Sequence, residues 1–116
     1  MSLFGTAGIR GKTADRITPT LALRVGKAIG NQAASDGTAV AVGRDGRITG
    51  PALLQAVAAG VVSAEAVVEQ LDMVPTPTLA FASRGQYGVM VTASHNPPQD
   101  NGLKLFHDGM ELSAQQ

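Results

Sequence analysis

The chain has 116 residues, 44% of them hydrophobic, which is enough apolar material for one modest core in a single domain. Its nine basic and nine acidic residues cancel, which disfavours nucleic-acid binding through a basic excess, and the lack of cysteine excludes disulfides and thiolate metal sites. No apolar run reaches the roughly 18 residues of a membrane-spanning helix, and the amino terminus has no basic-then-apolar signal pattern. We therefore expect a soluble cytoplasmic protein.

The first motif in the chain is rich in glycine. The stretch Phe4-Gly5-Thr6-Ala7-Gly8-Ile9-Arg10-Gly11 contains three glycines, which let a backbone bend closely around a ligand. On these residues alone, it is either a turn with a solvated Arg10 or a site in which Arg10 donates to an anion.

A helix and a strand are predicted next. Thr18 followed by Pro19 is typical of an N-cap and a first helical position, and with Gly37 as the exit the pattern predicts a helix from about 19 to 35. Residues 38–42 form a short β-branched run between glycines, which indicates a buried strand.

The loop after that strand carries charged side chains. Arg44, Asp45 and Arg47 follow the carboxyl end of the predicted strand, where ligands gather in open α/β sheets. These three residues form either a structural ion-pair cluster or part of the wall of a site.

Thr49 and Pro51 predict the start of a second helix. Gly60 interrupts this helix at a cost of about 1 kcal/mol relative to alanine, which indicates a close packing contact rather than a hinge. An edge strand is predicted at about 66–72, although acidic residues dilute its apolar pattern. The apolar stripe of the helix comprises Leu53, Leu54, Val57, Ala58, Val61 and Val62.

A short helix follows, with Thr76 as its predicted cap, Pro77 at its first position and Arg84-Gly85 at its end. We expect residues 79–82 to form its buried side. The apolar run 87–91 then delivers the chain to a segment of small, hydroxyl-bearing residues.

That segment, residues 92–98, displays a serine on a stiff loop, because two consecutive prolines stop any continuation as helix or central strand. Ser94 and His95 are adjacent and point to opposite sides of an extended backbone, so they do not form the Ser–His hydrogen bond of a hydrolase. The alternative is that both are ordinary loop residues.

The end of the chain predicts one more strand, residues 103–107, and a tight turn at Asp108-Gly109. Lys104 then projects on the face opposite Leu103 and Leu105. The alternation of strands and helices predicts an α/β fold: a three-layer α/β/α sandwich with a mostly parallel, mixed sheet of about four strands.

Four stretches in order resemble the α-D-phosphohexomutases, the family of phosphomannomutase and phosphoglucomutase. They are residues 4–11, Val42-Gly43-Arg44-Asp45-x-Arg47, Pro75-Thr76-Pro77-Thr78, and the serine loop Thr92-Ala93-Ser94-His95-Asn96-Pro97 with Asn101-Gly102-x-Lys104. The resemblance covers only the first of the family's four domains. It implies that residues 1–110 are that domain and that residues 111–116 begin a linker or helix toward a second one.

The resemblance also implies roles for individual residues. Ser94 would carry the phosphoryl group that moves between C1 and C6 of a hexose through a bisphosphate intermediate, and it would bind Mg²⁺ through that phosphate, with the other metal ligands outside the chain. The implied catalytic group is Ser94, Arg10, Lys104 and His95; the implied phosphate-binding group is Thr92, Ala93, Asn96, Asn101 and Gly102; Arg44, Asp45 and Arg47 would support the loop.

Two differences from the family pattern matter. The family's acidic metal loop, sugar-recognising loop and terminal phosphate clamp are absent, so we expect a hexose phosphate as the partner of the full-length enzyme but no turnover by this chain alone. Near Glu65 and Asp72 the resemblance would place glycines.

Two alternatives stay open: a noncatalytic anion or phosphosugar-binding module, and an isolated structural domain that self-associates as a homo-oligomer. The sequence does not select the sugar.

Overall fold

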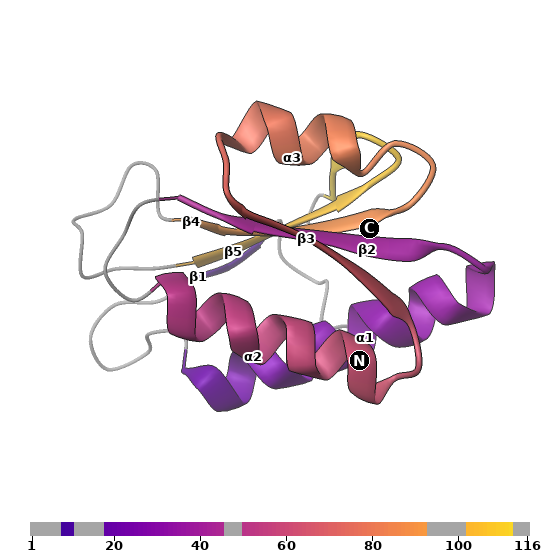
Figure 1. Cartoon of the computed structure of the whole chain (residues 1–116), viewed down its shortest axis with the longest axis horizontal. Coiled ribbons are helices and arrows are strands. Elements are labelled where there is room, and N and C mark those ends of the chain that lie inside the picture. Colours follow the sequence, from indigo (N-terminus) through magenta and orange to yellow (C-terminus); the bar gives the residue numbers. More distant parts are fainter. Residues whose placement is uncertain (1–7, 11–17, 46–49, 93–101, 113–116) are drawn as a thin grey trace.

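A computed structural model of the chain describes residues 8–10, 18–45, 50–92 and 102–112. Two helices, α1 and α2, cover one face of a twisted sheet and α3 covers the other, which confirms the predicted three-layer α/β/α arrangement (Figure 1). None of the described helices is long and apolar enough to cross a membrane. The elements are β1 (Gly8–Arg10), α1 (Pro19–Asp36), β2 (Ala39–Arg44), α2 (Gly50–Ser63), β3 (Val67–Met73), α3 (Thr76–Ala82), β4 (Tyr87–Thr92), β5 (Gly102–His107) and β6 (Met110–Glu111).

The sheet is mixed, with strand order β1-β5-β4-β2-β3 and with β6 paired to β5. β2 is parallel to both β3 and β4, whereas β5 is antiparallel to β4, β1 and β6. All described strands except β5 therefore run in one direction, as a mostly parallel sheet requires. The sheet has more strands than the four expected, because the short strands β1 and β6 both pair with β5 on the side away from β4, one at each end.

β1 lies in the glycine-rich stretch for which the residues suggested a turn. Gly8, Ile9 and Arg10 pair with Lys104, Leu103 and Gly102 of β5. Residues 8–10 are therefore extended because they pair with a strand about a hundred residues further along the chain. The local sequence pattern does not reveal this partner. β6 follows the predicted turn, where Asp108 and Gly109 have φ of 53° and 83°, the two positive values that a type I′ hairpin needs.

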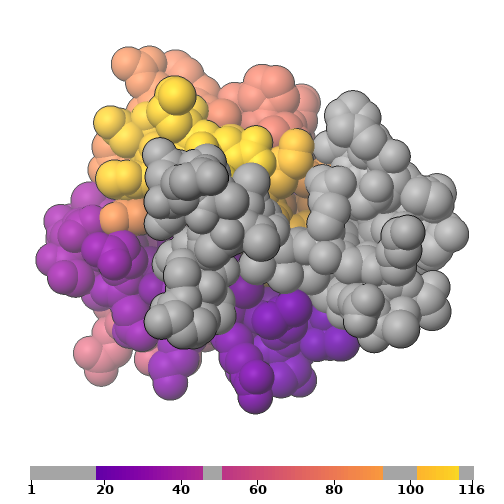
Figure 2. All heavy atoms as spheres, turned by 180° about the vertical axis from the view of Figure 1, so that it is seen from behind, coloured from indigo at the N-terminus to yellow at the C-terminus, as the bar shows by residue number. Residues whose placement is uncertain are grey.

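α1 begins and ends where its capping residues predict. The Thr18 side-chain oxygen accepts a hydrogen bond from the Leu21 backbone N–H at 3.1 Å, and Gly37 closes the helix in the left-handed conformation, with φ of 72°. Its buried side consists of Ala22, Val25, Gly26, Ile29, Gly30 and Ala33. Figure 2, the reverse view, shows α1 in purple below the β5–β6 hairpin in yellow.

α1 and α2 pack backbone against backbone through glycines. A Cβ on Gly60 would lie 2.1 Å from the carbonyl oxygen of Leu23, and a Cβ on Gly26 would lie 2.1 Å from that of Val57. The predicted close contact at Gly60 is therefore confirmed. The stripe of α2 is buried as expected, except at Val62, which is 56% exposed beside the sheet edge.

The sheet separates two apolar clusters. The larger lies between the sheet and the helices α1 and α2, and the smaller lies under α3, where Leu79 packs with Ala41, Met90 and Phe106. The prediction that Phe81 is buried was wrong: it is 68% exposed and the Arg84 guanidinium lies over its ring. α3 is seven residues long, so only a narrow side of it faces the sheet.

The ends of α3 also differ from the prediction. The helix begins at Thr76 with Pro75 as its N-cap and no side-chain cap bond, and it ends at Ala82 instead of at Arg84-Gly85. Ser83 closes it: the buried Ser83 hydroxyl donates to the Ala80 carbonyl and accepts from the Gly109 N–H. The 108–109 turn is thereby attached to the end of α3.

β3 is the edge strand that the sequence predicts, and it is irregular at two positions. Its register against β2 shifts so that Val42 pairs with Gln70 but Gly43 pairs with Asp72. Asp72 has φ of 60°, and Glu65, just before the strand, has φ of 64°. The family resemblance would place glycines near these two residues, and the left-handed backbone gives a physical reason for glycine there.

Candidate functional site

Those predicted site residues that the structure describes lie at or near one edge of the sheet. The carboxyl ends of β1, β2 and β4 meet there with the amino end of β5, because β5 runs against the others (Figure 1). Gly102 pairs with Arg10 on one side and with Thr92 on the other. We call this row, Arg10, Gly102, Thr92 and the neighbouring Asp45, the carboxyl edge. It is where ligands bind in open α/β sheets.

Lys104 lies two residues from the carboxyl edge along β5. It pairs with Gly8 on one side and with Met90 on the other, and it is partly buried. Leu103 and Leu105 belong to the larger core cluster, so strand alternation places Lys104 on the opposite face from them, as predicted, and this is the face that α3 covers.

Thr92 and Asp45 join the ends of β4 and β2. The Thr92 Oγ1 hydroxyl donates to Asp45 Oδ2 at 2.8 Å, and the Asp45 N–H donates to the Val91 carbonyl at 3.1 Å. Thr92 is only 2% exposed. The hydroxyl that the resemblance assigns to phosphate binding is thus directed at a carboxylate of the neighbouring strand.

Arg44 extends these contacts to the edge strand. Its Nε donates to Asp72 Oδ1 at 3.3 Å, and its Nη1 donates to the backbone oxygen of Asp45 at 3.1 Å. The Arg44 side chain is 17% exposed and that of Asp72 is 75% exposed. The interpretation foreseen was an ion-pair cluster of Arg44, Asp45 and Arg47. The ion pair that the structure describes joins Arg44 to Asp72 instead, and Arg47 lies outside the described residues. The sequence analysis missed this pairing, and the only signal was the unusual acid at a position suited to glycine.

Several predicted residues lie outside the described part of the chain. They are Ala93, Ser94, His95, Asn96, Asn101 and Arg47. Three of the described ranges end at Arg10, Asp45 and Thr92, and the last one begins at Gly102. The segments that carry the remaining predicted residues therefore all start from the carboxyl edge.

The described residues contain no group of three histidine, aspartate or glutamate side chains that could hold a metal ion. Asp45 accepts from Thr92, and Asp72 pairs with Arg44. Mg²⁺ prefers several oxygen ligands in octahedral order, and the described part of the chain does not offer them.

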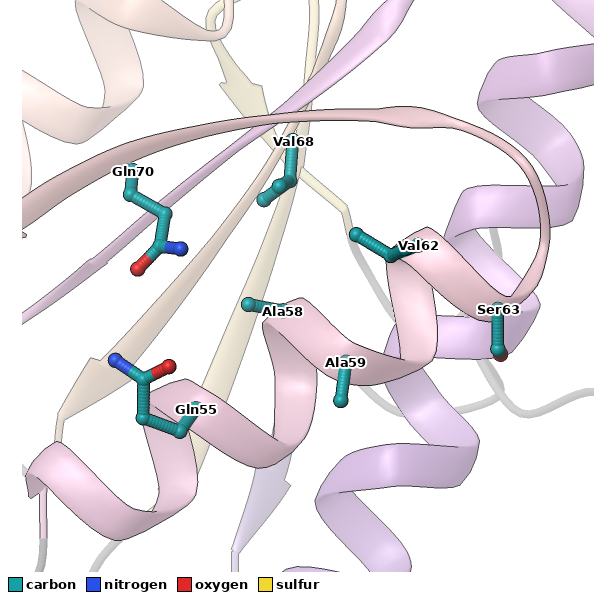
Figure 3. A pocket seen from close by; sticks show the side chains of 7 residues that line it. All are labelled: Gln55, Ala58, Ala59, Val62, Ser63, Val68 and Gln70. Atoms are coloured by element: carbon teal, nitrogen blue, oxygen red, sulfur yellow. The ribbon is translucent and has the colours of Figure 1, made fainter.

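A shallow pocket of about 440 Å³ lies elsewhere, between α2 and β3 (Figure 3). Its lining is Gln55, Ala58, Ala59, Val62, Ser63, Val68 and Gln70. The amides of Gln55 and Gln70 point toward each other across it, while Val68 and Ala58 face its apolar centre. None of the predicted site residues lines this pocket.

The opposite end of β4 holds the single tyrosine. The Tyr87 hydroxyl donates to the Asp36 carboxylate, and the His107 ring stacks on the Tyr87 ring with centroids 4.2 Å apart. Burial, and then the neighbouring Asp36, raise the pKa of Tyr87 to about 12. This cluster ties α1 to the sheet at the end remote from the carboxyl edge.

The sequence of the chain matches one protein-family model and several curated relatives. The family described as "Phosphoglucomutase/phosphomannomutase, alpha/beta/alpha domain I" matches residues 1–116. A phosphopentomutase of Thermococcus kodakarensis is 48% identical over 119 residues, and the match covers 100% of this chain and 26% of the relative. A phosphomannomutase/phosphoglucomutase of Pseudomonas aeruginosa is 42% identical over 119 residues, covering 99% and 26%.

A solved structure gives the same picture. A phosphoglucomutase/phosphomannomutase family protein from Burkholderia thailandensis superposes with a TM-score of 0.84 at 35% identity, covering 96% of this chain and 27% of that one. The chain spans about a quarter of the length of the curated relatives it matches.

Proposed function

The chain belongs to the phosphoglucomutase/phosphomannomutase family, whose α/β/α domain I it matches along its whole length, and from this premise we propose that it carries the phosphoryl-transferring serine of a sugar-phosphate mutase, Ser94. The observation that supports the proposal most is the register at the carboxyl edge. It brings the backbone of Arg10, the end of β4 that leads to Ser94, and Gly102, two residues before Lys104, onto neighbouring strands.

The proposed step is a phosphoryl exchange. The bond between phosphorus and the Ser94 oxygen breaks as a hydroxyl oxygen of the sugar phosphate attacks, and the serine recovers a phosphoryl group from the bisphosphorylated sugar. Arg10 and Lys104 hold the phosphoryl oxygens through charge-assisted hydrogen bonds and assist proton transfer, while His95 and Asn96 shape the loop.

Mg²⁺ would neutralise negative charge as the phosphoryl group moves, with phosphorylated Ser94 as one ligand. The described residues do not supply the others. Because the chain spans about a quarter of the length of its relatives, we expect no complete mutase turnover from these 116 residues alone. We expect only the single transfer of a phosphoryl group from a bisphosphorylated sugar to Ser94.

Relatives with different substrates in their names match this same region. They include a phosphopentomutase, a probable phosphoglucosamine mutase of Methanosarcina acetivorans and a phosphomannomutase/phosphoglucomutase, at 42–49% identity. The domain therefore supplies the phosphoryl-transfer step that such enzymes share, and the choice of sugar depends on residues outside it.

Intact-mass measurement tests the proposal. The chain is incubated with glucose 1,6-bisphosphate beside Ser94→Ala, and peptide mapping locates any added phosphoryl group. One phosphoryl group on Ser94 of the wild type and none on the variant is the expected result. A wild-type chain that binds the sugar phosphate in calorimetry but never acquires a phosphoryl group would be a noncatalytic binding module, and the proposal would be wrong.

A further inference from the structure

We propose that Thr92 is a positioning residue instead of a phosphate ligand: its hydrogen bond to Asp45 fixes the direction in which the chain leaves β4 toward Ser94. This inference rests on the proposed function, because it assigns Thr92 a task in placing the serine. It changes the role that the family resemblance gives to Thr92.

The first argument is the geometry of the hydroxyl group. A threonine hydroxyl has one proton to donate, and at 2.8 Å from Asp45 Oδ2 that proton is used. A hydrogen bond to a carboxylate is stronger than one between neutral groups, and the 2% exposure of Thr92 keeps water from competing. A phosphate oxygen needs a donor, and this hydroxyl has none left for it.

The second argument is the place of Asp45 in the fold. Its N–H donates to the Val91 carbonyl, so Asp45 is bound to β4 by its backbone and by its side chain at consecutive residues. Two bonds between the same pair of strand ends restrain both the separation and the rotation of those ends. Ser94 follows Thr92 by two residues, a length of chain that spans at most about 7 Å, so the position of Thr92 limits where the serine can lie.

The third argument is that Asp45 is itself held. Arg44 Nη1 donates to the Asp45 backbone oxygen, and Arg44 Nε is paired with Asp72 on the edge strand. The Val74 N–H donates to the Arg44 carbonyl at 3.0 Å. The chain of contacts thus runs from β3 through β2 to the end of β4. Asp72 adopts a left-handed backbone that glycine adopts at lower cost, and in return it supplies the carboxylate for Arg44.

The test compares isosteric and conservative variants. Thr92→Val keeps the volume and removes the hydroxyl, whereas Thr92→Ser keeps the hydroxyl. Thr38→Val is the matched control, because it makes the same change just before β2, where the Thr38 hydroxyl has no hydrogen-bond partner among the described residues. The readout is the rate at which glucose 1,6-bisphosphate phosphorylates Ser94, followed by intact mass, with thermal unfolding as the check that each variant is folded.

We expect Thr92→Val to slow phosphorylation by about 10- to 100-fold, the range for a displaced reacting group, with Thr92→Ser within about 3-fold of wild type and Thr38→Val unchanged. Asp45→Ala should slow the reaction as much as Thr92→Val does. The double variant should be no slower than either single variant, because both remove one bond. If the two slowing factors multiply instead, Thr92 and Asp45 act separately and the inference is overturned.

The failures are distinguishable. A wild-type chain that takes up no phosphoryl group overturns the proposed function, and this inference with it. A wild-type chain that is phosphorylated at the same rate as folded Thr92→Val overturns this inference alone. If Thr92→Val does not fold, folded Asp45→Ala decides by the same comparison, since Thr92 then has no carboxylate to bind.

Discussion

Gly60→Ala is the substitution whose effect the structure determines most sharply. In an isolated helix the change would be favourable by about 1 kcal/mol, because alanine has the highest helix propensity and glycine one of the lowest. In this fold the new Cβ would lie 2.1 Å from the Leu23 carbonyl oxygen and 2.7 Å from the Lys27 nitrogen. Both atoms belong to the backbone of α1, so neither can rotate away.

The clash can be relieved only if the two helices separate. An ordinary carbon contact is longer than about 3.4 Å, so α1 must move by roughly 1 Å from α2. Moving a packed helix loosens every contact along the interface, and overpacking of this kind costs about 1–3 kcal/mol or more. This cost exceeds the gain in propensity. We expect a net loss of about 1–2 kcal/mol in the free energy of unfolding and a melting temperature lower by about 4–8 °C.

The measurement is urea unfolding followed by far-ultraviolet circular dichroism, since the chain has no tryptophan. Ala59→Gly is the control, because Ala59 is on the exposed side of the same helix and reports propensity alone. The Ala59→Gly variant should lose about 1 kcal/mol in the free energy of unfolding. A Gly60→Ala chain that is more stable than the wild type would refute the close packing of α1 and α2.

Three further predictions concern stability. Glu65→Gly should raise the free energy of unfolding in urea by up to about 1 kcal/mol, because it removes the strain of a left-handed backbone. Asp72→Gly should raise it less, since this variant also loses the ion pair with Arg44. Equal increases for the two variants would show that the ion pair does not contribute to stability. Thr38→Val should raise the melting temperature by removing a buried hydroxyl without a described partner, and a fall would show that the hydroxyl is satisfied. Because the pKa of Tyr87 is raised, the unfolded chain loses the tyrosine proton at a lower pH than the folded chain does. The stabilisation from Tyr87 is therefore constant below pH 10, and up to about 2 kcal/mol of the free energy of unfolding is lost as the pH rises toward about 12. Tyr87→Phe should remove that part of the fall, and an unchanged pH profile would count against the Tyr87 hydrogen bond.

Local signals predicted the elements whose ends depend on local chemistry. Thr18 and Gly37 mark the ends of α1 because capping involves neighbours along the chain, and Asp108-Gly109 forms its turn because it tolerates positive φ. Gly60 predicted a close packing contact because glycine destabilises a helix interior and is seldom found there without a packing or functional cause. Of the carboxyl edge, Asp45 was a candidate because it follows a recognisable strand, whereas Arg10 was one because of the glycine-rich motif. Thr92 and Gly102 were candidates through the family resemblance.

Features that depend on which strands are neighbours could not be predicted from sequence. β1 is a strand only because it pairs with β5, and Arg44 meets Asp72 only because β3 lies beside β2 with a shifted register. Phe81 is exposed because the short α3 turns only one side to the sheet. The roles of Ser94 and of its neighbouring residues stay predictions.

The opposite direction of β5 has a consequence for the segment that joins it to β4. Thr92 and Gly102 are paired, so the segment between them starts and ends on adjacent strands about 5 Å apart. Its closure entropy depends only weakly on its length, and no crossover helix must be rebuilt when it changes. A change in the length of this segment would therefore cost little chain entropy, and the strands on either side of it could stay where they are.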